Sequence, residues 1–279
     1  EEPQGRRCRR ARRAGKPARM LIDSSWLPRP ATTTAPYALV VLNGHYSSDA
    51  ALGRLRSGAR FCVCGDGGAN ILHSFASART SGSHDLFSLR PPDAIVGDFD
   101  SIDPTVRESY ARDGVEISEL SDQDSTDFEK CLGRVHAWCS DAAVGAVPAA
   151  ELIVCAVGAF GDRLDHEFAA INVLHGDSAS RFKRVLLLSE AASACVLPAG
   201  RSVIRPDAAL EGPTCGLLPV GGPCVCSTSG LRWDLSSTPM RFGGLVSSSN
   251  CIEAQEVTIE TDAPVVWTTV LRPAGWREA

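Results

Sequence analysis

The chain has 279 residues, of which 44% are hydrophobic and 22% are charged, an ordinary composition for a globular protein that buries a substantial core. No apolar run approaches the roughly 20 residues that a membrane-spanning helix needs, so no membrane segment is expected. The net charge of −5 conceals a basic N-terminus: residues 21–279 hold 20 of the 28 basic and 31 of the 33 acidic residues, and their net charge of −11 argues against a nucleic-acid partner.

Residues 1–35 are predicted to form a disordered basic leader and a linker. The first 20 residues are Arg-rich, as transit peptides are, but they lack the apolar positions of an amphipathic helix. We favour a leader, or sequence upstream of a start at Met20. The eleven cysteines lie mostly in apolar runs, and the N-terminus does not resemble a signal peptide. Buried free thiols in the cytoplasm are therefore expected.

From residue 37 to about 190, short apolar runs alternate with helical patterns. Strands are predicted at 37–42, 60–64, 94–96, 115–120, 152–157 and 184–188. Helices are predicted at 49–57, after Asn70 to about 78, from Pro104, at 126–139 and after His166 to about 175. Asp103 fits a cap for the Pro104 helix, and Thr126 with Glu129 fits a capping box. Alternating strands and helices predict a parallel sheet covered on both faces, with ligands at the carboxyl ends of its strands.

After about residue 195 the helical periodicity disappears. Short segments such as 203–204, 215–220, 224–226, 256–260 and 265–271 are separated by Gly, Pro, Ser and Asp. This pattern is typical of an antiparallel β-sandwich or barrel. The predicted fold is an N-terminal α/β domain with a parallel sheet, residues 36–197, followed by a C-terminal antiparallel β-sandwich, residues 198–279.

Acidic side chains gather in two loops of the predicted α/β domain. Asp98 and Asp100 follow the strand at 94–96, and Asp122, Asp124 and Asp127 follow the strand at 115–120. In an extended segment Asp98 and Asp100 would point to one side, with Phe99 pointing into the core. Carboxylates gathered at one edge need a cation between them, and hard oxygen ligands suit Mg²⁺ with bound phosphates. A calcium loop is excluded, since Asp127 stands where that loop needs Gly. Caps and turns explain about half of such acids singly, but they explain the set poorly, because these loops follow parallel strands and are expected to converge on one edge. The acids expected there are Asp66, Asp98, Asp100, Asp124 and Asp127.

Two further loops have a polar sequence suited to a ligand. Gly67-Gly68 links a buried strand to a helix, and this layout fits either a phosphate-binding loop or an ordinary tight turn. Arg163 with Asp165 offers a phosphate contact and another acid, and His166 fits a ligand contact or a structural role equally. Metal, charge neutralisation and positioning are what phosphoryl transfer needs from a protein.

With these residues placed, the chain resembles the thiamin pyrophosphokinase family over roughly residues 37–271. The segments that carry the resemblance are Asp66-Gly-Gly-Ala-Asn70, Gly97-Asp-Phe-Asp-Ser-Ile102, Asp122-Gln-Asp-Ser-Thr-Asp-Phe128, Gly161-x-Arg-x-Asp165-His166, Cys215-Gly-Leu-Leu-Pro-Val-Gly221, Gly230-Leu-Arg-Trp-Asp-Leu235, Leu245-Val-Ser-Ser-Ser-Asn250 and Val257-x-Ile-Glu-Thr-Asp262. Each segment alone is a weak signal, but their order along one chain is highly specific. The resemblance implies transfer of pyrophosphate from ATP to the thiamin hydroxyl, with Mg²⁺, in a homodimer whose active site lies at the subunit interface.

The resemblance also implies roles for individual residues. Catalysis is expected to depend on Asp98, Asp100 and Asp127, and Mg²⁺ is expected to bind these three together with Asp66. The nucleotide is expected to contact Asp66, Gly67, Gly68, Asn70, Thr126, Arg163 and Asp165. Thiamin is expected to contact Gln123, Asp124, Trp233, Ser249 and Asn250, with the ring of Trp233 stacked on the cationic thiamin ring.

The sequence departs from the family pattern at Ala159 and Asp162, where glycines are usual. Added bulk at Ala159 would restrict the approach of the backbone to a ligand, and the extra carboxylate of Asp162 would weaken ATP binding. Two alternative hypotheses therefore stay open. One is a pyrophosphokinase for another alcohol, such as a hydroxymethylpterin, and the other is a protein that binds a nucleotide or thiamin without turnover.

Overall fold

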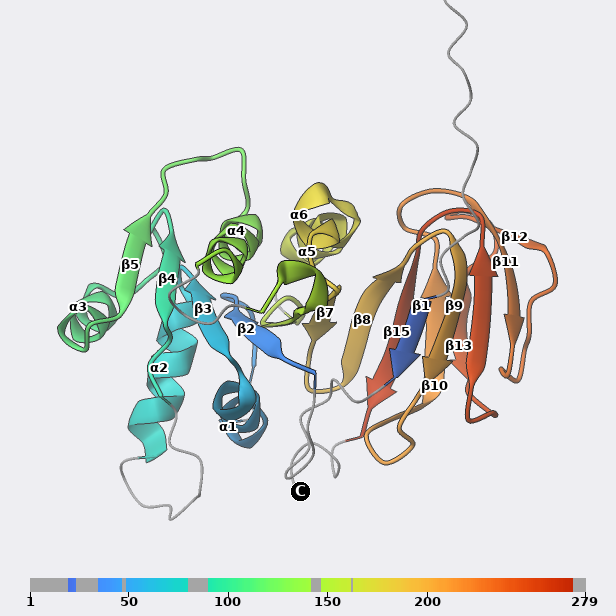
Figure 1. Cartoon of the computed structure of the whole chain (residues 1–279), viewed down its shortest axis with the longest axis horizontal. Coiled ribbons are helices and arrows are strands. Elements are labelled where there is room, and N and C mark those ends of the chain that lie inside the picture. The colour runs from blue at the N-terminus through green and yellow to red at the C-terminus, as the bar shows by residue number, and fades with distance from the viewer. Residues whose placement is uncertain are drawn as a thin grey trace, which may run out of the picture.

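The computed structural model describes residues 20–23, 35–46, 49–79, 90–141, 147–161 and 163–272. Its centre is a ten-stranded sheet with the strand order β13-β10-β15-β8-β7-β6-β2-β3-β4-β5 (Figure 1). Six neighbouring strands of this sheet are parallel. They are β2 (Tyr37–Val41), β3 (Phe61–Gly65), β4 (Ala94–Gly97), β5 (Glu116–Glu119), β6 (Ile153–Val157) and β7 (Arg184–Leu188).

Helices cover both faces of the parallel strands, as predicted (Figure 1). They are α1 (Asp49–Gly58), α2 (Gly68–Arg79), α3 (Pro104–Arg112), α4 (Asp127–Cys139), α5 (Leu164–His175) and α6 (Asp177–Ser180). Alternate side chains of β2 enter two different cores: Leu39 packs with residues of α1–α3, whereas Val40 packs with residues of α4–α6. Burial on both faces explains the continuous apolar run of this strand.

Two helix starts agree with the sequence analysis in atomic detail. Asp103 caps α3, and its Oδ1 accepts a hydrogen bond of 2.7 Å from the backbone N–H of Thr105. Thr126 and Glu129 form both halves of the predicted capping box at α4. Each cap satisfies backbone N–H groups that have no partner within the helix. The start of α4 is therefore fixed at the edge of the sheet where the acidic loops lie.

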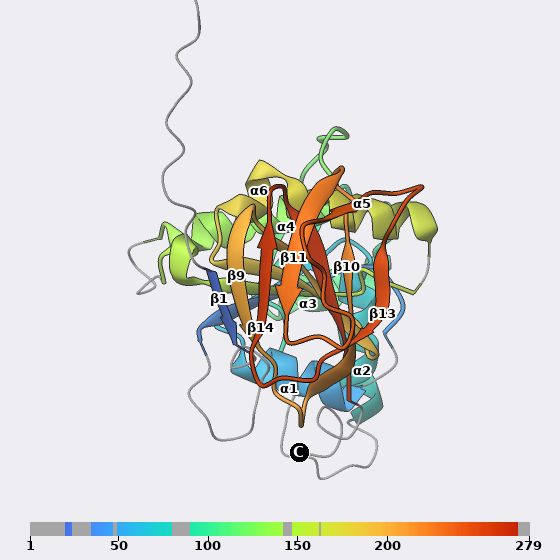
Figure 2. The same cartoon turned by 90° about the vertical axis from the view of Figure 1, so that its right-hand side faces the viewer.

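The C-terminal half is an antiparallel β-sandwich, as predicted. One layer continues the ten-stranded sheet through β8 (Ala192–Leu197), β15 (Val265–Leu271), β10 (Glu211–Leu218) and β13 (Ser247–Cys251). The other layer is a five-stranded sheet of β1 (Met20–Asp23), β9 (Gly200–Arg205), β14 (Val257–Thr261), β11 (Cys224–Ser229) and β12 (Thr238–Met240), which faces the viewer in Figure 2. Buried side chains such as Trp267 and Ile259 fill the space between the layers.

The structure differs from the sequence analysis at three strands and near the predicted domain boundary. Residues 20–23, predicted to be leader, form β1 and pair in parallel with β9; residues 1–19 and 24–34 lie outside the described ranges. The edge strands β12 and β13 were not predicted, because backbone pairing holds them without an apolar pattern. The large sheet runs through the predicted boundary near Leu197, since β8 pairs with both β7 and β15.

Candidate active site

A pocket of about 350 Å³ opens at the carboxyl ends of the parallel strands. Its walls come from the loops after β2, β3, β4 and β6 and from the first turns of α4 and α5. From β2 the chain adds β3, β4 and β5 on one side, whereas β6 pairs with the other side of β2. The loops after β2 and β6 lead to helices on opposite faces of the sheet. The pocket therefore lies at the topological switch point, where open α/β sheets bind ligands.

The loops after β2 and β6 approach each other so closely that neither tolerates a side chain. A Cβ atom at Gly44 would lie 2.0 Å from the carbonyl oxygen of Gly158. Gly158 has φ 76°, and a Cβ there would lie 2.3 Å from the carbonyl oxygen of Leu42. These contacts are with backbone atoms, which cannot rotate away. The two glycines therefore fix the floor of the pocket by close packing.

We expect Gly44→Ala to lower the free energy of unfolding by about 1–3 kcal/mol or more, because its methyl group collides with the peptide of Gly158. The matched control is Gly133→Ala in α4, where nothing lies within 4 Å of an added Cβ. Alanine is the better helix former, so this control should raise the free energy of unfolding by about 0.5–1 kcal/mol. Urea titration followed by circular dichroism measures both. Equal effects at the two positions would contradict the close-packing interpretation.

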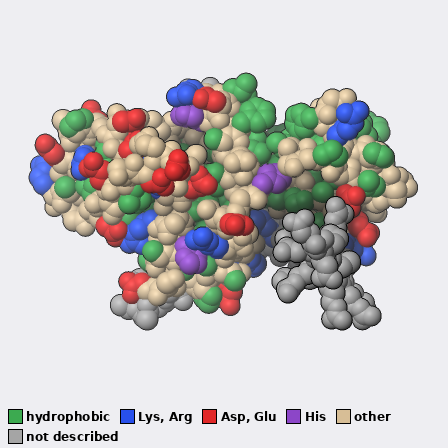
Figure 3. Space-filling model, turned by 90° about the horizontal axis from the view of Figure 1, so that it is seen from above, with side chains coloured by type: hydrophobic (Ala, Val, Ile, Leu, Met, Phe, Trp, Pro, Cys, Tyr) green, Lys and Arg blue, Asp and Glu red, His purple; other side chains and the backbone are tan. Residues whose placement is uncertain are grey.

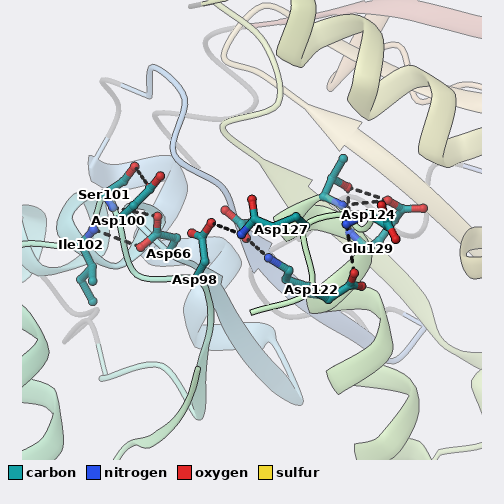
Figure 4. A network of polar contacts seen from close by, with 12 residues as sticks. Asp66, Asp98, Asp100, Ser101, Ile102, Asp122, Asp124, Asp127 and Glu129 are labelled. Atoms are coloured by element: carbon teal, nitrogen blue, oxygen red, sulfur yellow. Dashed lines mark hydrogen bonds and ion pairs between the residues drawn. The ribbon is translucent and has the colours of Figure 1, made fainter. Parts of the chain in front are cut away.

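Three carboxylates converge at one end of the pocket. Oxygens of Asp66, Asp98 and Asp100 lie within 4.8 Å of one another, and Figure 4 shows Asp98 between Asp66 and the side chain of Asp127. Mg²⁺ holds its oxygen ligands at about 2.1 Å in an octahedron, so three hard carboxylate donors at this spacing fit such an ion after small adjustments. Asp127 lines the same pocket, but its Oδ1 lies 3.3 Å from Lys130 Nζ rather than within this group.

The surroundings of these carboxylates favour a bound cation. Burial is the largest cause of the raised pKa of Asp66, and the neighbouring Asp100 adds to it. Burial likewise raises the pKa of Asp127, although the adjacent Lys130 opposes this effect. At Asp98 the pKa is lowered, chiefly by the hydrogen bond of 3.1 Å from Gln123 Nε2. The negative charge of buried Asp66, with Asp98 and Asp100 close to it, is costly without positive charge nearby.

The backbone of the Asp98–Asp100 segment differs from the prediction. The segment is not extended, since Phe99 has φ 63°, a left-handed conformation that is rare for a bulky residue. The ring of Phe99 does pack against the core beside α1–α3, as predicted, and the Arg107 guanidinium lies 4.5 Å from its centroid. A turn rather than the two-residue repeat of a strand therefore brings the two carboxylates together.

Another wall of the pocket comes from two helix N-termini. The first turns of α4 and α5 face the pocket through Thr126–Phe128 and Arg163, and helix N-termini favour anions. His166 also lines the pocket, as does the apolar side chain of Phe160. Viewed from above, acidic side chains gather on the α/β half, whereas the sandwich half exposes more apolar surface (Figure 3). This wall thus offers Arg163 and two helix N-termini, alongside the carboxylates of Asp127 and Glu167.

Sequence reasoning missed several residues of this pocket. Leu42, Asn43 and Gly44 follow a buried strand as the predicted loops do, so the rule about strand ends would have found them. Glu167 lines the pocket, and its Oε1 accepts a hydrogen bond of 2.8 Å from the backbone N–H of Gly161. No sequence motif identifies Glu167 as a pocket residue. Ala159, one of the departures from the family pattern, lines the pocket, whereas Asp162 lies outside the described residues.

Of the predicted site residues, six line the pocket: Asp66, Asp98, Asp100, Thr126, Asp127 and Arg163. The others do not line it: Gly67, Gly68, Asn70, Gln123, Asp124, Asp165, Trp233, Ser249 and Asn250. The structure gives several of these a different environment. A Cβ at Gly68 would lie 2.1 Å from the carbonyl oxygen of Val41, so close packing already requires this glycine. Asp165 pairs with Arg163, which lowers the pKa of Asp165.

Trp233 lies in the sandwich half, on an ordered turn between β11 and β12. Its side chain is 57% exposed, and the Arg232 guanidinium lies 5.6 Å from the ring centroid. Buried Asn250 holds the turn, since its Oδ1 accepts from Trp233 N at 3.2 Å and its Nδ2 donates to Trp233 O at 3.0 Å. Asp234 accepts three more hydrogen bonds within the turn, from Thr228, Gly230 and Leu231. An exposed aromatic ring on a rigid turn is a ready contact for a planar ligand.

Comparison with known proteins gives one consistent family. The model of the thiamin pyrophosphokinase catalytic domain matches residues 52–186, and the model of the thiamin pyrophosphokinase vitamin B1 binding domain matches residues 201–266. Thiamine pyrophosphokinase 1 of Oryza sativa subsp. japonica is 39% identical over 273 residues, covering 91% of this chain and 98% of the relative. Thiamine pyrophosphokinase 1 of Arabidopsis thaliana is 38% identical over 265 residues, covering 92% and 95%.

Solved structures share the fold. Yeast thiamin pyrophosphokinase superposes with a TM-score of 0.77 at 21% identity, covering 92% of both chains. The enzyme from Candida albicans superposes with a TM-score of 0.75 at 23% identity, covering 93% of this chain and 95% of its own. The two family models together span most of the described chain, and the plant relatives match it nearly end to end. The chain therefore belongs to the thiamin pyrophosphokinase family.

Proposed function

We propose that the chain catalyses transfer of pyrophosphate from ATP to the hydroxyl of thiamin, which is thiamine diphosphokinase activity. One observation carries the proposal: a member of this family brings Asp66, Asp98 and Asp100 together in a pocket at the switch point of its sheet. In the reaction the thiamin hydroxyl oxygen bonds to the β-phosphorus of ATP. The bond from that phosphorus to the oxygen bridging to the α-phosphorus breaks, AMP leaves with that oxygen, and the hydroxyl proton is released.

The residues of the pocket divide this work between binding and positioning. Asp66, Asp98 and Asp100 would hold Mg²⁺, and Asp127 stands beside them. When bound, Mg²⁺ neutralises phosphate charge and favours the leaving of AMP. Arg163 and the first turns of α4 and α5 attract the phosphate chain from the other wall. In phosphoryl transfer such charge neutralisation and alignment supply most of what the protein contributes.

The acceptor is proposed to be thiamin because of Trp233. Its exposed ring suits the cationic ring of thiamin, and Asn250 and Asp234 keep it in place. Asn250 is nearly buried and its amide is already used in holding Trp233, so we propose that it acts on thiamin through that ring. Gln123 donates to Asp98, and we propose that Gln123 and Asp124 lie beside the reacting phosphate and the alcohol.

We further propose a homodimer in which Trp233 of the partner subunit completes each acidic pocket. Within one subunit Trp233 does not line that pocket. Large apolar side chains are exposed near both sites, on α5 (Leu164, 67% exposed; Phe168, 49%) and on the loop between β12 and β13 (Phe242, 54%; Leu245, 47%). Phe168 and Phe242 line one shallow groove. Exposed apolar area of this kind supports an interface with a second copy.

The same chain suits a reducing compartment, and we propose the cytoplasm. All ten cysteines in the described part of the chain are free, and most are buried. Disulfides are rare where glutathione and thioredoxin keep thiols reduced. No helix of the described residues is long and apolar enough to cross a bilayer.

The direct test is incubation of the full chain with thiamin, ATP and Mg²⁺, followed by chromatography of AMP and thiamin diphosphate. We expect both products in equal amounts, and none after the divalent metal is chelated. A competing hydroxymethylpterin separates thiamin from another alcohol as acceptor. Folded protein that binds ATP but releases no AMP would refute the activity and support a protein that binds without turnover.

A further inference from the structure

The loop that carries Asp98 and Asp100 has no regular secondary structure. Residues 98–103 connect β4 to α3 without belonging to a helix or strand, and Phe99 within them has φ 63°. A non-glycine residue in this conformation persists where its surroundings impose it. Two side chains hydrogen-bond the backbone of this loop just after Phe99: Asp66, which follows β3, and Asn70, in the first turn of α2.

All three polar groups of Ser101 form hydrogen bonds, one with Asp100 in the same loop and two with Asp66 and Asn70. Its hydroxyl donates a hydrogen bond of 2.7 Å to Asp100 Oδ1. Its backbone N–H donates to Asp66 Oδ2 at 3.0 Å, and its carbonyl oxygen accepts from Asn70 Nδ2 at 3.0 Å. The orientation of the Asp100 carboxylate therefore depends on where the peptide of Ser101 is held.

Asn70 holds the backbone of the loop on both sides of Ile102. Besides its donation to Ser101, its Oδ1 accepts a hydrogen bond of 2.9 Å from the backbone N–H of Asp103. The side-chain nitrogen and oxygen of Asn70 thus both form hydrogen bonds with the backbone of the loop, at Ser101 and Asp103. Asn70 is itself fixed in the first turn of α2, where its backbone N–H donates to Gly67 O at 3.0 Å. Its side chain does not line the pocket.

We infer that Asn70 is a positioning residue, which orients Asp100 for the metal through Ser101 rather than by touching the nucleotide. Aspartate has the same size but lacks the donor for Ser101 O, and alanine lacks both hydrogen bonds. Groups that orient metal ligands typically change metal affinity or activity about 10- to 100-fold when they are removed. The inference rests on the proposed function for its effect on turnover but not for its effect on metal binding.

The test measures binding of Mn²⁺ alone to the full chain by electron paramagnetic resonance, without nucleotide. We expect Asn70→Ala and Asn70→Asp to weaken Mn²⁺ binding about tenfold or more, and Ser101→Ala to weaken it less. The matched control on α2 is Ser74→Ala, which removes an exposed hydroxyl that bonds within its own helix and should leave binding unchanged. In turnover assays the Asn70 variants should need more Mg²⁺, with a smaller loss of kcat at saturating Mg²⁺.

A double variant distinguishes positioning from an independent role. If Asn70 acts through Ser101, adding Ser101→Ala to the Asn70→Ala variant should weaken Mn²⁺ binding little further. The fold-loss in Mn²⁺ affinity of the double variant should then be smaller than the product of the two single fold-losses. Affinity of Asn70→Ala within twofold of wild type, or effects that multiply fully, would overturn the inference. Wild-type protein that binds Mn²⁺ tightly but releases no AMP would instead refute the proposed function and leave this inference standing.

Discussion

Asp100→Asn is expected to lower kcat by about 10²- to 10³-fold or more, a loss typical for removal of one group that stabilises charge in the transition state. The substitution keeps the size of the side chain, and an amide oxygen still accepts the hydrogen bond from the Ser101 hydroxyl. What it removes is a negative charge 4.8 Å or less from the carboxylates of Asp66 and Asp98. The loss therefore reports metal binding rather than packing.

The control for this experiment is Asp113→Asn. Asp113 is an exposed acid at the end of α3 and does not line the pocket, so its removal changes the net charge by the same amount. We expect its kcat to stay within twofold of wild type. Thermal unfolding should be similar for both variants, which separates chemistry from stability. Near-normal turnover of Asp100→Asn would refute the metal role of this carboxylate.

Trp233→Ala is expected to lower kcat/KM for thiamin by about 10- to 100-fold, the loss that removal of a desolvated cation–π contact brings, with little change in KM for ATP. The ring is exposed and its turn is held by Asn250 and Asp234, so truncation should not unfold the sandwich. Trp233→Phe keeps an aromatic face and should recover part of the loss. An equal loss for ATP and thiamin would contradict a role in binding thiamin.

Mixing the two variants tests whether the site is shared between subunits. In a dimer whose pocket takes Asp100 from one subunit and Trp233 from the other, each mixed dimer has one intact site and one doubly altered site. Random reassociation of equal amounts should then restore about one quarter of the wild-type sites. If Trp233 served the pocket of its own subunit, the mixture would show only the mean of the two separate activities.

Much of this molecule was predictable because the determining interactions are local in the chain. Continuous apolar runs such as that of β2 predicted strands buried on both faces, and the caps at Asp103 and Thr126 predicted where α3 and α4 begin. The position of polar loops after parallel strands predicted that five acids would meet at one edge. Asp66, Asp98 and Asp100 do meet there and Asp127 lines the same pocket, whereas Asp124 does not line it. These rules need only the residue types and their spacing.

Only the tertiary structure decided how those carboxylates are held, because that depends on contacts between segments distant in the chain. Phe99 takes a left-handed conformation where the spacing of Asp98 and Asp100 predicted an extended one. The loop that contains it is hydrogen-bonded at Ser101 to Asp66, which follows β3, and to Asn70 of α2. The amide of Asn70 hydrogen-bonds the backbone of the loop, a contact that no sequence pattern indicated. Sequence patterns record burial and local turns, whereas the partner of a side chain across a sheet edge is set by the fold as a whole. For this protein the sequence determined which residues lie near the site. The packing of its loops determined which of them line the pocket and which hydrogen-bond the loops without lining it.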